Sequence, residues 1–234
     1  MTPRLIYLLA VLYSLQCVKC ADLQGLANSA QRTAQVVEQS ITNASIAAEN
    51  VLKSANTQAS QLIDSTLTRI RQMAEDVGNK IKSLVQAGRN FQTCVSEQSE
   101  AVRSLVPVAG QELQACVQAA VQSLREYSAD IKDIGAQALQ LLLQVPARVS
   151  SCTFSGLSLL SCLGTVFEYT SSKGLLLVSS SSHDLAHLTV LGLQLPGQLA
   201  KCGASQVAKV ATQLAGIGAS IDACVTSSAA AADA

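Results

Sequence analysis

Two histidines and several paired acids are the side chains in this sequence whose type and spacing could do chemistry. His183 and His187 are four residues apart, so on a helix they share one face and could hold a metal ion between them. They are also the only two histidines of the chain, and so the only candidates for a histidine general base. Two ligands do not complete a metal site, and Asp184 points elsewhere on the same helix. We therefore expect no metal and no cofactor.

The acidic pairs and the serines do not form a catalytic motif. Glu75 with Asp76 and Asp130 with Asp133 are interpreted as solvated helix faces. The sequence has no GxSxG nucleophile elbow and no Gly-rich phosphate loop. We expect no catalytic residue, and a secreted hydrolase is only a third class of function behind two kinds of binding protein.

The chain opens with a predicted secretory signal. Arg4 precedes an apolar run of about eleven residues, which is shorter than the roughly 20 that a membrane span needs. Cleavage near Cys20 removes the CxxC formed by Cys17 and Cys20. The remaining chain has 14 basic and 16 acidic residues, so it lacks the basic face that nucleic acid requires. We predict a secreted, extracellular protein with no transmembrane segment after signal removal.

The mature sequence keeps six cysteines, which predicts three disulfides in an oxidising compartment. Their positions are Cys94, Cys116, Cys152, Cys162, Cys202 and Cys224. The intervals are 22, 36, 10, 40 and 22 residues, nearly the same read backwards, which indicates a chain folded back near Leu157. The nested set is therefore predicted: Cys94–Cys224, Cys116–Cys202 and Cys152–Cys162.

Geometry favours this set without deciding it. A continuous helix of 22 residues is about 33 Å long, whereas bonded cysteines need Cα atoms within about 7 Å. Two antiparallel helices stapled twice need equal spacing between staples, and both segments have 22 residues. Cys94–Cys116 competes because Pro107 and Gly110 could turn the chain between them. A parallel Cys94–Cys202 pair also fits the equal spacing.

The elements that carry these residues are predicted to be helices. Residues 22–93 contain no proline, and their apolar positions follow an eleven-residue repeat typical of a nearly straight helical stripe. That stripe is Ala55, Ala59, Leu62, Thr66, Ile70, Met73, Val77, Ile81, Leu84 and Gly88. It could bury against partner helices or lie on lipid. Asn43 begins the one glycosylation sequon, so the protein is expected to be a glycoprotein exposed at this position.

Two further stripes have spacings of three and four residues. One is Leu113, Val117, Ala120, Leu124, Tyr127, Ile131, Ile134, Ala138, Leu141 and Val145; the other is Val207, Val210, Leu214, Ile217, Ile221 and Cys224. We expect Pro107 to bend or restart a helix and Pro146 to end one. Two short helices are expected near 157–169 and 175–193, and Pro196 closes that region.

The predicted fold is all-α, an elongated helical bundle or long helical hairpin stapled by three disulfides. The predicted segments are a signal peptide at 1–20, an amphipathic helical segment at 21–92, a six-cysteine helical domain at 93–226 and a disordered tail at 227–234. Aromatic residues are 3% of the chain and Trp is absent, which also favours helices packed through Ala, Leu, Val and Ile.

The signal peptide, the Ala/Gln/Ser-rich helical N-terminal half and the spaced cysteines from Cys94 to Cys224 together resemble the secreted insect proteins of the tsetse EP-protein domain family. The resemblance covers about residues 90–226, and the Glu-Pro repeat tail of that family is absent here. It implies a non-enzymatic extracellular insect protein of gut, haemolymph or secretory tissue, with an interaction or structural role that in some members is linked to immunity.

The eleven-residue repeat separately resembles exchangeable apolipoproteins, including insect apolipophorins. It implies an alternative function, a lipid-binding helical protein. The expected partner is thus an unknown protein or a lipid, and self-association is also compatible with the stripes.

Overall fold

The computed structural model of the chain describes residues 23–87, 92–152 and 159–232. These residues form three helices: α2 (Leu23–Ala87), α3 (Gln92–Ser151) and α4 (Leu159–Ala232). Strands are absent from the described ranges. The predicted all-α class is confirmed, and the bundle alternative holds instead of the hairpin.

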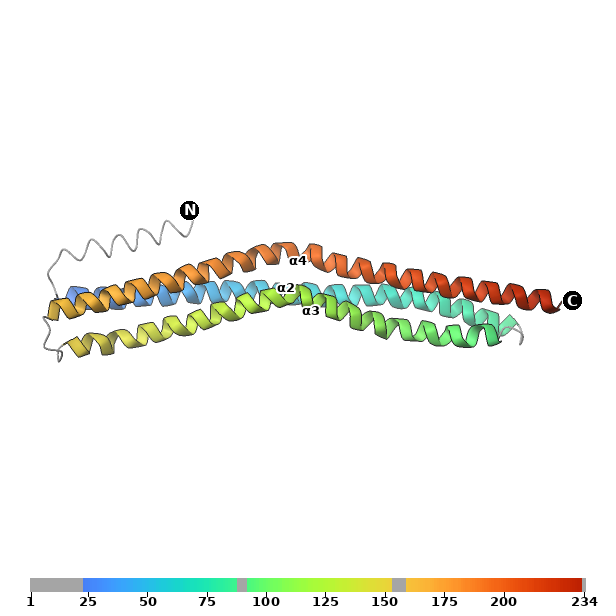
Figure 1. The fold of residues 1–234 in the computed structure, drawn as a ribbon, viewed down its shortest axis with the longest axis horizontal. Coiled ribbons are helices and arrows are strands. Elements are labelled where there is room, and N and C mark those ends of the chain that lie inside the picture. The colour runs from blue at the N-terminus through green and yellow to red at the C-terminus, as the bar shows by residue number, and fades with distance from the viewer. Residues whose placement is uncertain (1–22, 88–91, 153–158, 233–234) are drawn as a thin grey trace. The chain divides into compact units, whose positions relative to one another are not determined.

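The three helices are divided between two compact units. Unit 1 takes residues 23–52 of α2, 124–151 of α3 and 159–190 of α4, and unit 2 takes the remaining segments of the same helices. In each unit the α2 and α4 segments run in the same direction and the α3 segment is antiparallel to both (Figure 1). Helix α2 supplies one wall of the core in each unit.

One cluster in the core of unit 2 receives residues from all three helices. Ile70 and Ile81 come from α2, Val102 from α3, and Val210 and Ile221 from α4, each at most 7% exposed. Full burial of one such side chain contributes about 1.5–3 kcal/mol to stability. A cluster drawn from three distant parts of the sequence is what holds the three segments of this unit together.

Two clusters of the same kind lie in unit 1. Ile41 of α2, Ile134 of α3 and Leu177 of α4 belong to one. Val145 of α3 and Phe167 of α4 belong to the other, together with small residues of α2. Alanine at the α2 positions lets the helix backbones approach closely, so a core with little aromatic content can still be filled.

The predicted stripes are the faces that these cores bury. From Ala55 to Leu84, every position of the eleven-residue stripe is buried or half-buried, while Gly88 lies outside the described residues. The stripe on α3 from Leu113 to Val145 and the one on α4 from Val207 to Cys224 are also buried or half-buried throughout. In this structure the stripes pack on other helices of the same chain.

Two buried hydroxyl groups of α4 donate hydrogen bonds to backbone carbonyls of the same helix. The Thr170 hydroxyl is fully buried and donates to the carbonyl of Val166 at 2.8 Å. The Ser181 hydroxyl donates in the same way to the carbonyl of Val178 at 3.1 Å. Because these donors are satisfied locally, the polar side chains do not require partners on another helix.

Two disulfides join α3, or Cys152 directly after it, to α4. The Cys116–Cys202 bond lies in unit 2, with Cα atoms 5.9 Å apart, and the Cys152–Cys162 bond lies in unit 1, with Cα atoms 5.6 Å apart. These are two of the three pairs of the nested set. The sulfur of Cys224 is also disulfide-bonded. The side chain of Cys94 lies outside the described residues, so the Cys94–Cys224 pair stays a prediction.

Pro146 does not end a helix and Pro107 does not restart one, so these two expectations were wrong. Pro107 and Pro146 lie within α3 and Pro196 lies within α4. All three are exposed, which leaves the ring and the missing hydrogen bond on the solvent side of the helix. An interior proline costs about 3 kcal/mol, and buried neighbours such as Val145 and Leu195 offset that cost by about 1.5–3 kcal/mol each.

The length of α4 also differs from the prediction. One helix replaces the two short helices and the third segment that were expected after residue 157. Four consecutive serines at 179–182 do not interrupt this helix. The Ser181 hydroxyl donates a hydrogen bond to the carbonyl of Val178 in the same helix. The helix also continues through 227–232, part of the predicted tail, because alanine has the highest helix propensity.

Several predictions concern residues that the structure does not describe. The signal peptide at 1–20 with its CxxC, the fold-back near Leu157 and positions 233–234 lie outside the described residues. Among the helices that are described, none has a stretch long and apolar enough to cross a membrane.

Candidate functional site

The histidine pair lies in unit 1 on an exposed face of α4. The ring centroids of His183 and His187 are 4.4 Å apart in an edge-to-face arrangement. The His187 ring also stacks on Tyr127 of α3, with centroids 5.5 Å apart and planes within 6°. The predicted shared face is therefore present, and a tyrosine that the sequence analysis assigned to the α3 core stripe holds one ring.

An aspartate next to the pair is partly withdrawn from water. Burial raises the pKa of the Asp184 carboxyl, the negative charge of Asp130 raises it further, and the two histidines act in the opposite direction. Within the described part of the chain, no group of three or more His, Cys, Asp or Glu side chains could hold a metal. The pair offers two ligand nitrogens and an aromatic stack, which does not make a complete metal or catalytic site.

The other acids that the sequence singled out are separated from the histidines or exposed. Glu75 and Asp76 lie on α2 in unit 2, and all four members of the two acidic pairs are exposed. Asn43 is exposed on α2, as a glycosylated position must be.

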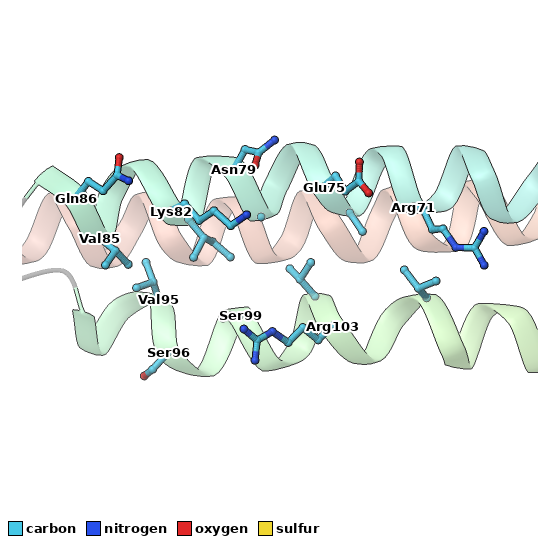
Figure 2. Close-up of a pocket in the computed structure, with 15 residues that line it drawn as sticks. Arg71, Glu75, Asn79, Lys82, Val85, Gln86, Val95, Ser96, Ser99 and Arg103 are labelled. Atoms are coloured by element: carbon cyan, nitrogen blue, oxygen red, sulfur yellow. The ribbon is translucent and has the colours of Figure 1, made fainter.

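An open groove with the character of a binding site lies between α2 and α3 in unit 2 (Figure 2). It has a volume of about 640 Å³, within the range of small-molecule sites. We call it the α2–α3 groove. Its apolar lining is Ala74, Gly78, Ile81, Val85, Val95, Val102 and Val106, and its polar lining is Arg71, Glu75, Asn79, Lys82, Gln86, Ser96, Ser99 and Arg103.

The groove arises from the helical repeat of its two walls. On α2, Ala74, Gly78, Ile81 and Val85 follow one another at steps of four, three and four, which places them on one side of the helix. Figure 2 shows Lys82 and Val85 on the side of α2 that faces α3, with Asn79 and Gln86 directed away from it. Ala74 and Gly78 carry little or no side chain, so the space between the walls stays open.

The described residues that line the groove carry more positive than negative charge. Arg71 and Lys82 on α2 and Arg103 on α3 are opposed by one lining acid, Glu75. Where the chain is described, none of the three cations is ion-paired; the recorded pairs are Lys80–Asp222, Lys132–Glu49 and Lys209–Glu112. The arrangement suits a ligand with an apolar body and an anionic group.

This groove was not predicted from the sequence. Ile81 was assigned to the eleven-residue stripe, and Glu75 was interpreted as part of a solvated helix face. The available signal was the second apolar row from Ala74 to Val85, next to the main stripe, with a glycine in the interior of a helix. Which helix would face that row cannot be read from α2 alone.

Comparison of the chain with protein-family models, curated proteins and solved structures finds no match. The resemblance to the tsetse EP-protein domain family thus stays a prediction, and the geometry described above carries the functional argument.

Proposed function

We propose that the chain is a secreted, non-enzymatic helical protein with an extracellular interaction or structural role of the tsetse EP-domain type in an insect gut, haemolymph or secretory tissue. The observation that carries this proposal is the closed bundle. The apolar stripes of α2, α3 and α4 pack against one another in the core. In each unit a disulfide also links the α3 segment, or the residue directly after it, to α4. Such a scaffold presents stable outer surfaces.

The proposed compartment follows from cysteine chemistry. Disulfides persist in extracellular and secretory environments and are rare in reducing ones. We propose three bonds in the mature protein, the third being Cys94–Cys224. Expression in cultured insect cells should release a protein that lacks residues 1–20, carries a glycan at Asn43 and has no free thiol. Retention of the chain inside the cells with reduced cysteines would contradict this part of the proposal.

The alternative function is lipid binding by a bundle that opens, as in exchangeable apolipoproteins. One observation favours it: Leu175 and Leu176 of α4 are 53% and 64% exposed, so this helix is apolar on its outer face as well. Opening would have to expose residues such as Ile70, which is fully buried, and Cys116–Cys202 restrains that motion. We therefore place the closed bundle first.

Vesicles separate the two functions. The secreted, disulfide-intact chain is mixed with phosphatidylcholine vesicles, with and without phosphatidylglycerol, and turbidity and far-ultraviolet circular dichroism are followed. The closed bundle predicts that the vesicles stay turbid and that helicity does not rise. Clearance of the vesicles by the oxidised protein would replace the first function with the alternative, and clearance only after reduction would show that the disulfides prevent opening.

A further inference from the structure

We propose that the α2–α3 groove binds one molecule of a long-chain fatty acid, with the carboxylate at Lys82 and Arg103 and the acyl chain against the aliphatic lining. This goes beyond the proposed function, because the ligand enters a groove of the closed bundle and needs no helix to separate from its neighbours. It also differs from the alternative function, in which the buried stripes open onto a lipid surface.

The shape and lining of the groove fit an acyl chain. With the carboxylate at Lys82, the α2 wall from Lys82 to Arg71 offers about 16 Å at 1.5 Å per residue, which accommodates most of an extended long-chain acyl group. The apolar lining consists of alanine, glycine, isoleucine and valine only. The described lining residues include no aromatic side chain to stack on a planar ring, so these walls favour a flexible aliphatic ligand over a sugar or a nucleobase.

The charges fix the chemical class of the head group. Lys82 and Arg103 come from opposite walls of the groove, as Figure 2 shows. Arg71 is a third cation and Glu75 is the single acid among the described lining residues, which therefore carry two more positive charges than negative ones. Guanidinium and ammonium groups bind carboxylates through charge-assisted hydrogen bonds. An anionic amphiphile is therefore favoured over a neutral or zwitterionic one.

Gly78 offers a direct way to close the groove. A Cβ atom at this position would meet nothing within 4 Å, so the glycine is not required by a close helix contact. Glycine inside a helix is destabilising by about 0.8–1.0 kcal/mol relative to alanine. A larger side chain at residue 78 would thus project into open space and occupy the ligand's place without opposing the helix.

The test measures palmitate binding by isothermal titration calorimetry with the full secreted chain, below the concentration at which palmitate forms micelles. We expect one molecule per chain. Gly78→Leu should weaken binding at least about tenfold because the side chain fills the site. The matched control is Gly216→Leu on α4, where a Cβ also meets nothing within 4 Å and which lies outside the groove lining. Thermal unfolding of both variants verifies that they fold.

The charge is tested separately. Lys82→Gln and Arg103→Gln should each weaken palmitate binding by roughly two- to fivefold, the effect of losing an exposed ion pair. Lys201→Gln, an exposed cation of unit 2 outside the groove, should leave it unchanged. The neutral alcohol hexadecanol and zwitterionic lysophosphatidylcholine should bind more weakly than palmitate.

Absence of palmitate binding, or binding that folded Gly78→Leu leaves intact, would overturn the site. Equal binding of palmitate and hexadecanol would overturn the role given to the cations. A negative result in the palmitate titration does not contradict the proposed function, because the secretion experiment and the vesicle assay test that function.

Discussion

The Cα atoms of Cys116 and Cys202 lie 5.9 Å apart, and the bond between these residues joins α3 to α4 within unit 2. The next residue, Gly203, faces α2: a Cβ there would lie 3.0 Å from the Thr66 hydroxyl oxygen and 3.2 Å from a methyl carbon of Leu62. Two consecutive residues of α4 thus hold it against both neighbouring helices.

The loops closed by the two disulfides predict unequal contributions to stability. Cys116 and Cys202 are 86 residues apart in sequence, whereas Cys152 and Cys162 are 10 apart. On the chain-entropy model, removing the first bond lowers the free energy of unfolding by about 4.6 kcal/mol and removing the second by about 2.7 kcal/mol. Denaturant unfolding of the two double Cys→Ala variants checks this, and a larger loss for the shorter loop would contradict it.

Gly174 is expected to tolerate no side chain. A Cβ at this position of α4 would lie 2.7 Å from a methyl carbon of Val37 on α2. Valine is stiff about its first side-chain torsion, so Gly174→Ala should lower the free energy of unfolding by about 1–2 kcal/mol through overpacking.

The control for this variant is Gly164→Ala, on the same helix and in the same unit, where a Cβ meets nothing within 4 Å. It should instead raise stability by up to about 1 kcal/mol through helix propensity. Equal effects of the two substitutions in thermal or denaturant unfolding would show that α4 and α2 are not in close contact at Gly174.

Asp184 is expected to make the fold less stable as pH rises. Burial raises the pKa of its carboxyl in the folded state above the ordinary value of 3.8. The folded chain therefore binds the proton more tightly than the unfolded chain, and stability falls as pH rises from that ordinary value through the folded pKa. Asp184→Asn should be more stable than the unchanged chain at neutral pH.

The gain should disappear below pH 3.8, where the carboxyl is protonated in both states, and this provides an internal control. Denaturant unfolding of the two proteins across this pH range measures the difference. A variant that is no more stable at neutral pH, or equally more stable at every pH, would contradict the assignment of the effect to the charge of Asp184.

The buried faces could be predicted from the sequence because they are a local property. Residues such as Ile70, Ile131 and Val210 recur at helical spacing, and each lies at most 1% exposed in the bundle. Helix length was harder to predict. Pro107 and Pro146 have the local chemistry of a helix break, but tertiary burial of their neighbours outweighs that preference, and the sequence around a proline does not show which side will face the core.

The candidate site depended on packing between helices and was not predicted. Val85 of α2 and Val95 of α3 lie opposite each other across the groove (Figure 2). This placement depends on the rotation of α2 relative to α3, which the sequence of either helix alone does not show. For the histidine pair, in contrast, part of the arrangement could be predicted from the sequence. The spacing of His183 and His187 gave their shared face correctly, and only the structure placed Tyr127 against one ring.

Peptide mapping of the unreduced, secreted protein tests the folded-back bundle most directly. The account predicts linked fragments containing Cys116 with Cys202, Cys152 with Cys162 and Cys94 with Cys224. In this arrangement each bond joins parts of the chain that the fold-back brings together. A fragment joining Cys94 to Cys116 would contradict it, because that bond requires α3 to turn back between two residues that the structure places on one continuous helix.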